Sequence, residues 1–477
     1  MSDPRAPRGR SRRRPQTARA DPARKAAYDV LRAVHDRDSY TNLLLPPLLR
    51  SRGITGRDAA FATELVSGTL RRQGTYDAVV GANLDRPLGK VDGAVLDALR
   101  LGAHQLLSMR VPSHAAVGTT VDLVRAEVGR GPSGFVNAVL RKVAAHDLSG
   151  WVRRVAPDPA SDPVGFSSVA HSHPRWVVSA LAEALTVALG AGRADEELDE
   201  LLAADNEPPR VTLVARPGLA TVEELVAAGG TASSLSPYAV QLLGGDPGAI
   251  PAVAEGRAGV QDEGSQLVAA ALAQATVAGR DELWLDVCAG PGGKSALLAA
   301  LAAGRGARLL ASELQPHRTR LVATATAAAT GGLLGVVTAD GTRPPWSAGV
   351  FDRALVDAPC SGLGALRRRP EARWRRAPED VDRLVPLQRA LLSSALDSVR
   401  PGGMVAYVTC SPVVAETSGV VSAVLAQRKD VKVEDAAPLL EGVPDLHAET
   451  MRIPGTVQLW PHRHGTDAMF LALLRRS

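Results

Sequence analysis

The second half of the chain alternates short apolar segments with helical stretches, and this alternation restricts the possible fold more than any other feature. Five segments have the length and the aliphatic character of buried strands: LWLDV (283–287), ARLLAS (307–312), LGVVTA (334–339), FDRALVDA (351–358) and GMVAYVTC (403–410). Helical stretches such as KSALLAALAAG (294–304) lie between them. Strands that alternate with helices predict a doubly wound α/β domain with a mostly parallel sheet. Such sheets bind their ligands beyond the carboxyl ends of the strands.

The first third of the chain has the periodicity of helices. Along one expected helix, valines recur at steps of four, three and four residues: Val117, Val121, Val124 and Val128. This spacing places apolar side chains on one face of a helix. Asp58 precedes another apolar helical run, and we expect it to be the N-cap of that helix. We therefore expect an all-α bundle over residues 22–146, a pattern that by itself specifies no function.

Shifts in composition divide the 477 residues into five segments. The stretch DLSGWVRRVAPDPASDPVG is rich in Pro, Ser, Asp and Gly, and this composition is typical of a linker. A helical run and a short strand, RVTLVAR, follow it and predict a small α+β region. The expected segments are a disordered Arg-rich tail (1–21), the helical domain (22–146), the linker (147–165), the α+β subdomain (166–260) and the α/β domain (261–477).

The net charge of +5 is concentrated at the N-terminus. Residues 1–25 carry nine Lys and Arg against Asp3 and Asp21, a balance of +7 that leaves the remaining chain near −2. A basic arm of this kind favours a polyanion partner, because it can neutralise phosphates. The alternative is a solubilising tail without a binding role.

The sequence also argues against several classes of protein. No apolar run reaches the roughly 18 residues that a membrane span needs, and the N-terminal segment lacks the apolar core of a secretory signal. The three cysteines, Cys288, Cys360 and Cys410, are far apart and form no CxxC motif, which argues against a disulfide framework or a zinc ribbon. We expect a cytoplasmic protein without membrane attachment, and a monomer.

The segment LDVCAGPGGKS (285–295) follows the first expected strand of the α/β domain and opens a helix. Its three glycines allow the backbone to approach a ligand closely, and the helix start offers free N–H groups. A P-loop would need glycine at Cys288, and the dinucleotide fingerprint would need glycine at Ser295, so the segment is neither. A plain structural turn is the alternative.

Acidic residues follow the next two expected strands. Glu313 comes 20 residues after Gly293, and a carboxylate at the end of the second strand commonly binds ribose hydroxyls. Asp340 ends the third strand, where it could border an adenine. Each acid alone could instead cap a helix. Together with Asp286 they outline a site for an adenosine ligand without a pyrophosphate, and S-adenosylmethionine fits that description.

The other two cysteines follow the last two expected strands, in VDAPCSGLG (356–364) and VAYVTCSP (405–412). Carbon C5 of cytosine is a poor nucleophile, but a thiolate that adds to C6 makes an enamine whose C5 can attack a methyl donor. An acid near N3 favours that addition, and another group must later remove the C5 proton. Cys410, Asp357 and Cys360 can supply these parts. The alternative is that both thiols are small buried hydrophobic groups.

A basic segment, ALRRRPEARWRR (365–376), lies between these two cysteines. Arginine together with tryptophan suits phosphate contacts and base stacking, although a solvated helix face would have the same composition. The candidate RNA contacts are Arg367, Arg368, Arg369, Arg373, Trp374, Arg375 and Arg376.

These motifs resemble those of the bacterial Sun/RsmB/Fmu family of 16S rRNA (cytosine-5) methyltransferases. DVCAGPGGKS resembles the family's D-x-C-A-A-P-G-G-K-T loop, DAPCSGLG its D-A-P-C-S-G-x-G motif, and VTCSP its T-C-S motif. VQDEGSQL and RRRPEARWRR resemble its Q-D-x-x-S-Q and R-R-x-P-[DE]-x-x-W segments. LRLGAHQLL, VPSHAAVGTTVDLVR and GFVNAVLRKV are similar to the NusB-like RNA-binding module of this group. The resemblance implies a NusB-like helical domain followed by a Rossmann-like methyltransferase domain.

The resemblance also assigns roles to residues. It implies that Cys410 is the nucleophile, that Cys360 helps to resolve the covalent adduct, and that Asp357 lies near both the base and the methyl donor. In the related DNA enzymes the Pro-Cys thiol attacks instead, so the sequence leaves the order of the two thiols open. The residues implied to bind S-adenosyl-L-methionine are Cys288, Ala289, Gly290, Pro291, Gly292, Gly293, Lys294, Glu313, Asp340 and Asp357.

The expected activity is S-adenosylmethionine-dependent methylation of C5 of an unstacked cytosine in 16S rRNA or its precursor. Two alternatives remain open: the same chemistry on tRNA, and an RNA-binding protein whose methyltransferase domain is inactive. The NusB-like module favours 16S rRNA. No metal is expected at HSH (171–173) or HRH (462–464), because neither has Cys or carboxylate partners at suitable spacing.

The sequence departs from the family's motifs at three places. Gly290 replaces the usual alanine, and Thr417 replaces the asparagine that usually follows Glu416. In HGTDAMF, the residues from Asp467 to Met469 stand where the family commonly has D-G-F-F. None of these changes removes a catalytic group, but the third leaves the contacts near the site open.

Overall fold

The computed structural model describes residues 20–37, 39–446 and 451–477, and the chain forms two compact units, Met1–Ala156 and Pro157–Ser477. The Arg-rich tail expected over residues 1–21 lies almost entirely outside the described residues. Among the described residues, no helix is both long and apolar enough to cross a membrane.

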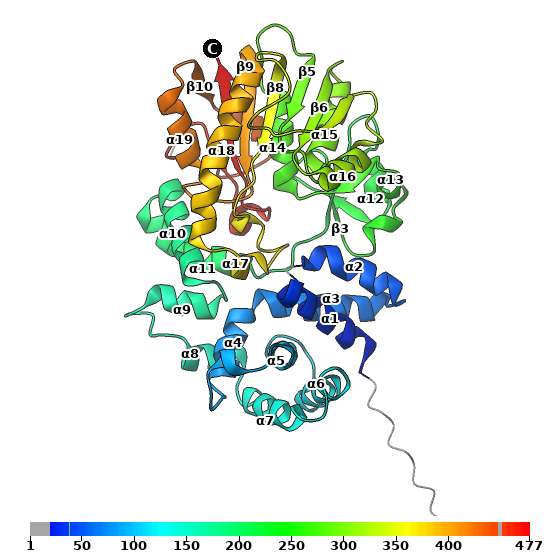
Figure 1. Cartoon of the computed structure of the whole chain (residues 1–477), viewed down its shortest axis with the longest axis vertical. Helices are drawn as coiled ribbons and strands as arrows, with labels where there is room; N and C mark the ends of the chain where they lie inside the picture. Colours follow the sequence, from blue (N-terminus) through cyan, green and yellow to red (C-terminus); the bar gives the residue numbers. More distant parts are fainter. Residues whose placement is uncertain (1–19, 38, 447–450) are drawn as a thin grey trace, which may run out of the picture. The chain divides into compact units, whose positions relative to one another are not determined.

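The first unit is built from helices, as expected (Figure 1). Its helices are α1 (Pro22–Arg37), α2 (Thr41–Ser51), α3 (Gly56–Arg71), α4 (Gln73–Gly81), α5 (Gly93–Leu107), α6 (Ser113–Glu127), α7 (Ser133–Val143) and α8 (Leu148–Val155), with a 3₁₀ turn at Leu88–Lys90. The valine face of α6 is buried in a single core that all eight helices share. Burial of one apolar face from each helix holds this bundle together.

Asp58 is not the N-cap that the sequence predicts. Helix α3 starts at Gly56, so Thr55 is the cap residue and Asp58 lies within the first turn. Gly53 and Gly56, which precede this apolar run, both have positive φ, and the chain turns at these glycines. The helix therefore begins earlier in the chain than expected. A carboxylate in the first turn is still favourable, because it faces the positive end of the helix dipole.

The segment 147–165, which its composition predicts to be a linker, contains helix α8 and the start of the next helix. Asp147 caps α8 by accepting a 2.7 Å hydrogen bond from the Gly150 amide, and the buried Trp151 indole donates to the Val143 carbonyl at 2.8 Å. Asp162 caps the next helix. The aspartates that we interpreted as loop residues therefore serve as helix caps.

The second unit begins with three helices and a small sheet. The helices are α9 (Pro163–Ala170), α10 (Arg175–Leu189) and α11 (Ala191–Ala204). The sheet is antiparallel with strand order β2-β3-β1-β4. Its elements are β1 (Thr212–Ala215), α12 (Val222–Ala227), β2 (Gly230–Ala232), β3 (Ala239–Leu242), α13 (Pro251–Ala254) and β4 (Ala258–Val260).

The large sheet of the second unit has the order β10-β12-β9-β8-β5-β6-β7, with β11 paired to β12 (Figure 1). The strands β5 to β9 are parallel, whereas β10, β11 and β12 pair antiparallel at one edge. The strands are β5 (Leu283–Asp286), β6 (Arg308–Glu313), β7 (Leu333–Thr338), β8 (Phe351–Asp357), β9 (Val399–Thr409), β10 (Val431–Glu434), β11 (Val457–Gln458) and β12 (Phe470–Arg476). The expected mostly parallel sheet is confirmed, and all five predicted strands are present.

Helices cover both faces of this sheet. Alternate residues of β8 belong to different cores: Ala354 and Val356 pack with α18 and α19, whereas Leu355 packs with α14 and α15. This division follows from the period of two along a strand. The helices are α14 (Glu263–Gln274), α15 (Gly293–Ala303), α16 (Pro316–Thr326), α17 (Ala372–Arg375), α18 (Pro378–Ser398), α19 (Ser418–Gln427) and α20 (Pro461–His464).

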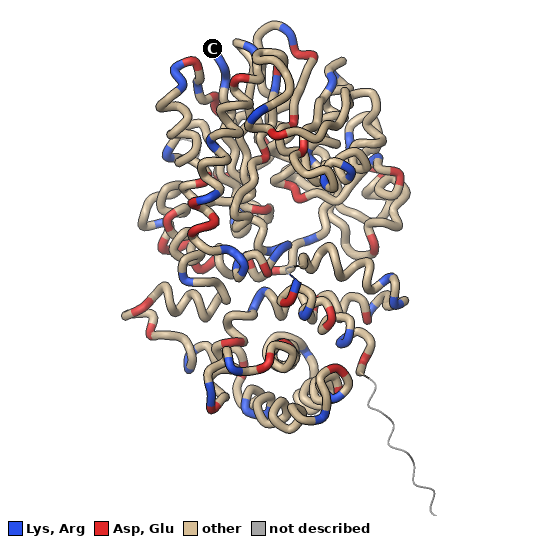
Figure 2. Tube along the Cα trace, in the orientation of Figure 1, with Lys and Arg blue, Asp and Glu red and all other residues tan. Residues whose placement is uncertain are grey.

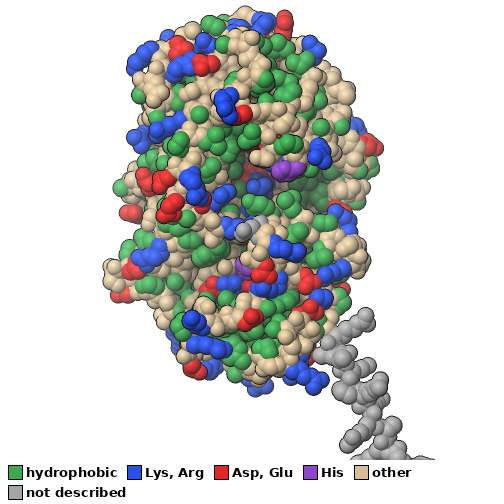
Figure 3. All heavy atoms as spheres, viewed as in Figure 1, with side chains coloured by type: hydrophobic (Ala, Val, Ile, Leu, Met, Phe, Trp, Pro, Cys, Tyr) green, Lys and Arg blue, Asp and Glu red, His purple; other side chains and the backbone are tan. Residues whose placement is uncertain are grey.

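Basic and acidic residues alternate over the helical unit (Figure 2), and the face in Figure 3 shows the same mixture of side chains. Lys25 pairs with Glu127 at 2.6 Å, and Arg100 pairs with Asp77 at 2.7 Å. Part of the basic charge of this unit is therefore neutralised within it.

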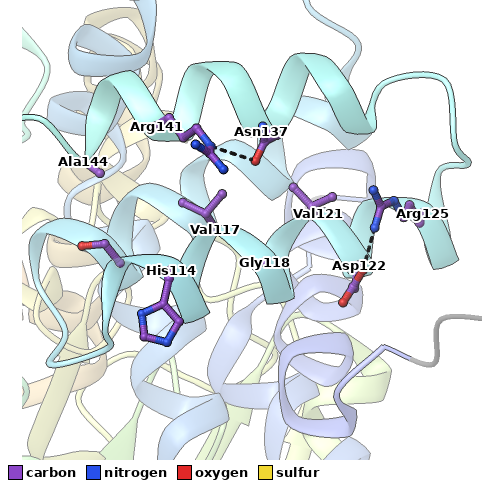
Figure 4. A pocket seen from close by; sticks show the side chains of 10 residues that line it. His114, Val117, Gly118, Val121, Asp122, Arg125, Asn137, Arg141 and Ala144 are labelled. Atoms are coloured by element: carbon purple, nitrogen blue, oxygen red, sulfur yellow. Dashed lines mark hydrogen bonds and ion pairs between the residues drawn. The ribbon is translucent and has the colours of Figure 1, made fainter.

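Helices α6 and α7 enclose a shallow groove lined by valines and by polar side chains (Figure 4). Two of its basic side chains bond within their own helices, Arg125 to Asp122 at 3.0 Å and Arg141 to Asn137 at 3.4 Å. None of the site residues predicted from the sequence lines this groove.

Candidate active site

The register of two parallel strands brings Cys360 and Cys410 together. Strands β8 and β9 are neighbours, with Asp357 opposite Val408, so both chains leave the sheet at the same edge. Cys360 lies three residues beyond the end of β8, and Cys410 directly follows the end of β9. Their Sγ atoms are 3.5 Å apart, and both residues are half-buried. The two thiols thus form one site at the ligand-binding edge of the sheet.

Gly364, the second glycine of the D-A-P-C-S-G-x-G motif, lets two backbone segments come close together at the carboxyl ends of these strands. The Gly364 amide donates to the Cys410 carbonyl at 2.9 Å, and its carbonyl accepts from the Ala468 amide at 2.8 Å. A Cβ at position 364 would lie 2.2 Å from the Ala468 oxygen and 2.9 Å from the Cys410 oxygen. Only glycine fits between these two carbonyls.

The two thiols differ in acidity. The hydrogen bond that the Cys360 thiol donates lowers the pKa of Cys410, helped by the Lys294 ammonium, although burial and Asp357 act in the opposite direction. The same hydrogen bond, together with burial, raises the pKa of Cys360 well above its usual value. Cys410 is therefore the more acidic of the two thiols.

We expect iodoacetamide to alkylate Cys410 at lower pH than Cys360, because the thiolate is the reacting form and a lower pKa gives more thiolate at a given pH. In a Cys360→Ala variant the profile of Cys410 should move to higher pH, because the donated hydrogen bond is lost. Peptide mass spectrometry over about pH 6 to 9 measures both rates, since the cysteines lie on different tryptic peptides, 354–367 and 390–428. Identical profiles for the two thiols would contradict this assignment.

The glycine loop, residues 288–294, joins β5 to α15, and Asp286 fastens both of its ends. One carboxyl oxygen accepts from the Ser295 hydroxyl at 2.6 Å, and the other accepts from the Cys288 amide at 3.3 Å. Burial raises the pKa of Asp286 to about 7. Asp286 therefore fixes the conformation of the loop through hydrogen bonds at both of its ends.

Two glycines of the loop are needed for different reasons. Gly292 has a φ of +113°, and a Cβ there would lie 2.6 Å from the Ala325 Cβ. At Gly290 an added Cβ would lie 2.2 Å from a Glu313 carboxyl oxygen and 2.8 Å from the Arg318 guanidinium. Gly290, where the family usually has alanine, thus lies at a point where Glu313 and Arg318 come close to the loop.

The three acids predicted to bind the cofactor lie at the same edge as the loop. Glu313 ends β6 and accepts hydrogen bonds from the amides of Gly290 and Gln315, both at 3.0 Å. Asp340 lies two residues beyond β7 and accepts from the amide and hydroxyl of Thr342 at 2.9 and 2.7 Å. These hydroxyl and amide bonds lower the pKa of Asp340.

Asp357 ends β8 and forms a 2.8 Å ion pair with Lys294 from the glycine loop. Burial acts to lower the pKa of Lys294, but the ion pair outweighs it and raises that pKa. The ion pair connects the loop to the strand that leads to Cys360, so the loop and the thiols form one continuous site.

Gln261, in the segment VQDEGSQL, is a site residue to which sequence reasoning gave no role. Its side chain is 7% exposed, and neither its amide oxygen nor its amide nitrogen has a hydrogen-bond partner among the described residues. It lies 3.8 Å from the point that a Cβ on Gly293 would occupy. Buried amides normally have partners, so this one fits a polar ligand held at the loop. The carboxylates at the strand ends suit the hydroxyl and amino groups of S-adenosylmethionine in the same way.

Two arginines of the basic segment that was predicted to contact RNA are buried in the structure. Arg373 is completely buried and donates to Asn206 Oδ1 at 2.8 Å and to two backbone carbonyls at 3.1 Å. Arg367 is also buried and donates to the Gly465 carbonyl at 2.6 Å. Both guanidiniums hold parts of the second unit together, and burial removes them from solvent. Arg368 and Arg369 are exposed, whereas the remaining members, Trp374, Arg375 and Arg376, are partly exposed.

The residues that depart from the family's motifs near the end of the chain make defined contacts. Asp467 is buried, forms an ion pair with Arg368, and donates through its amide to the Asp262 carboxylate at 3.2 Å. Burial, reinforced by Asp467, raises the pKa of Asp262 to about 6. Met469 is buried in the core beside α14, and Thr417 donates through its hydroxyl to the Val413 carbonyl at 3.0 Å.

Histidines of both motifs form hydrogen bonds within the fold. His462 lies 2.9 Å from the Glu197 carboxylate, and His171 lies 2.7 Å from that of Asp199. Within the described ranges, no group of three His, Cys, Asp or Glu side chains is arranged to hold a metal.

Comparison with known proteins identifies both units. The family model of the 16S rRNA methyltransferase RsmB/F matches residues 274–475, and that of the NusB family matches residues 21–145. The chain is 53% identical over 472 residues to Rv1407 of Mycobacterium tuberculosis, whose name describes it only as a methyltransferase; the match covers 98% of this chain and 99% of that protein. It is 31% identical over 462 residues to ribosomal RNA small subunit methyltransferase B of Pseudomonas putida, covering 94% and 98%. Among solved structures, the crystal structure of PH0851 has the same fold, with a TM-score of 0.76 at 20% identity over 95% of this chain and 98% of that chain.

The fold, the glycine loop and these matches define an RNA methyltransferase, with S-adenosylmethionine as the expected cofactor. More narrowly, the chain belongs to the RsmB/F family of 16S rRNA methyltransferases and carries an N-terminal NusB domain. The resemblance inferred from the motifs is therefore confirmed.

Proposed function

We propose that this protein methylates C5 of a cytosine in 16S rRNA through a covalent bond between Cys410 and C6 of the base. The observation that carries the proposal is the pair of thiols 3.5 Å apart at the ligand edge of the sheet, with the lower pKa at Cys410. A thiolate that adds to C6 of a pyrimidine makes C5 nucleophilic. Two thiols of unequal acidity suit a reaction in which one adds to the ring and the other handles a proton.

Each group of the site has a part in this scheme. The Cys410 thiolate forms the bond to C6, and N3 takes up a proton from solvent, which balances the charge that moves onto the ring and is held by a hydrogen bond to the Asp357 carboxylate. N3 releases this proton when the ring double bond is restored. S-adenosylmethionine supplies the methyl group that C5 receives. Once Cys410 is bonded to C6, Cys360 releases its own proton to solvent and takes the C5 proton as a thiolate, and the electron pair of that C–H bond restores the ring double bond as the Cys410–C6 bond breaks. Cys410 leaves as a thiolate, so it is regenerated.

We assign cofactor binding to the loop from Cys288 to Lys294 with Glu313, Asp340 and Asp357, and we add Gln261 to this set. The unpartnered amide of Gln261 and the carboxylates at three strand ends support the assignment. The substrate proposal is supported by the names of the relatives, which specify small-subunit ribosomal RNA, and by the NusB domain. Of the basic segment, only the members that remain at least partly exposed are retained as candidate RNA contacts.

A methyl-transfer assay tests the proposal. Purified protein and S-adenosylmethionine with a tritiated methyl group are incubated with unmodified 16S rRNA, free or assembled in small-subunit particles, and separately with tRNA. We expect the label in 16S rRNA, as 5-methylcytidine after digestion to nucleosides. Label confined to tRNA would establish the alternative substrate, label in another nucleoside would exclude the C5 chemistry, and no label with retained RNA binding would indicate an inactive domain.

A further inference from the structure

Both cysteines of the site are followed by a serine, and both serines bond to one buried carboxyl group. The chain reads Cys360-Ser361 after β8 and Cys410-Ser411 after β9. Glu416, on the turn before α19, is completely buried. Its Oε2 accepts from the Ser361 hydroxyl at 2.5 Å and from the Ser411 hydroxyl at 2.6 Å. One side chain therefore joins the two loops that carry the thiols.

Further bonds fix both sides of this connection. Glu416 Oε1 accepts from the Ser361 amide at 2.7 Å and from the Gln388 side chain at 3.1 Å. Gln388 also donates to the Pro359 carbonyl at 2.8 Å, so α18 holds the chain just before Cys360. The Tyr407 hydroxyl, from the strand that leads to Cys410, donates to the backbone carbonyl of Glu416 at 2.7 Å. A buried carboxyl group that accepts four hydrogen bonds has a narrowly determined position.

We propose that Glu416 is a positioning residue that sets the distance and the orientation between the Cys360 and Cys410 thiols. The two loops belong to segments 50 residues apart in the chain. Backbone bonds of 2.9 Å join these segments at Ala358–Val408 and at Gly364–Cys410, before and after Cys360. Between these two bonds, the Glu416 carboxyl group connects Ser361 to Ser411. This inference rests on the proposed function, in which both thiols act in the same methyl-transfer reaction.

The proposal requires that loss of the carboxyl group separate the thiols without preventing folding. In Glu416→Gln an amide NH₂ group replaces one carboxyl oxygen. This NH₂ group would face hydrogen-bond donors of Ser361, Ser411 or Gln388, so the network must rearrange. Asp352→Asn is the matched control. Asp352 is equally buried and accepts from two backbone amides at 2.8 Å and from Arg280 and Arg400, but it lies at the start of β8, at the opposite edge of the sheet.

The first readout is the rate at which diamide couples Cys360 to Cys410. The diazene takes up both thiol hydrogens as the S–S bond forms, and the linked tryptic peptides are counted by mass spectrometry. We expect the coupling rate to fall about tenfold in Glu416→Gln and kcat for methyl transfer to fall about 10- to 100-fold, with KM for RNA within about twofold, because small displacements of reacting groups are costly. Asp352→Asn should melt at a lower temperature but keep both rates within about twofold of the unaltered protein.

Two outcomes would overturn the proposal: a folded Glu416→Gln protein with unchanged coupling and kcat, or an Asp352→Asn protein that loses both to the same extent. If Glu416→Gln does not fold, Ser411→Ala removes one of the bonds to Glu416 together with the contacts of the same hydroxyl to Ser361 and to the Val413 amide. It is expected to slow coupling in the same direction by a smaller factor, and an unchanged rate would count against the proposal. The coupling assay needs no methyl transfer. A protein that couples its thiols rapidly but makes no 5-methylcytidine would therefore disprove the proposed function and leave the positioning role standing.

Discussion

A Cys410→Ala variant is expected to lose methyl transfer by at least about 10³-fold, because the nucleophile that activates C5 is removed and no neighbouring group can replace it. Cys360 is 3.5 Å away. The variant lacks the bond to Cys410 that is the main cause of the raised Cys360 pKa, but burial still raises this pKa, so Cys360 supplies little thiolate. The measurement is the initial rate of 5-methylcytidine formation in 16S rRNA under saturating cofactor.

The variant should bind S-adenosylmethionine with unchanged affinity in calorimetry, because Cys410 follows β9 whereas the glycine loop follows β5. This control separates a missing nucleophile from a damaged fold. A Cys410→Ala protein that retains a tenth or more of the activity would show that the reaction does not pass through this thiol.

A Cys360→Ala variant is expected to accumulate the covalent intermediate, whereas the Cys410→Ala variant cannot form it. If Cys360 assists removal of the C5 proton, the bond from Cys410 to C6 still forms and the methyl group is still transferred, but Cys410 cannot leave. Loss of a group that transfers a proton costs about 10²- to 10⁴-fold in the step concerned. Multiple turnover should fall by that factor, while a protein–RNA species that survives sodium dodecyl sulfate builds up on gels.

The double variant Cys360→Ala/Cys410→Ala is the control for this experiment, and it should form no such species. An adduct that persists in the double variant would have to involve another residue. A Cys360→Ala protein with normal turnover and no adduct would remove Cys360 from the mechanism and would leave only its hydrogen bond to Cys410.

The sequence alone is sufficient to predict the parts of the site that follow strands. Apolar runs ended by Asp-Ala-Pro-Cys and by Thr-Cys-Ser fix the strand ends, and parallel neighbours end at a common edge. The strand pattern therefore places Cys360, Cys410, Asp357 and Glu313 near one another. It does not predict the antiparallel edge, β10 to β12, because these short strands pair with residues far away in the chain.

The environment of single polar residues could not be predicted in the same way. Arg373 and Arg369 look equivalent in the segment RRRPEARWRR, but Arg373 is completely buried against Asn206 and carbonyls from a distant segment, whereas Arg369 is exposed. Glu416 looks like one more acid on a turn. Only the fold shows that it reaches the serines beside both cysteines. Gln261 likewise becomes notable only because its buried amide has no partner among the described residues.

The most direct test of the central claim is to identify the atom that bonds to the base. RNA with 5-fluorocytidine at the target position can receive the methyl group but cannot lose fluorine as a cation, so the adduct stays in place after transfer. After nuclease and trypsin digestion, mass spectrometry should find the methylated fluoropyrimidine nucleotide on the peptide 390–428, which contains Cys410 as its only cysteine. The same mass on the peptide 354–367, which contains Cys360, would exchange the two roles, and no adduct on either peptide would contradict the covalent mechanism.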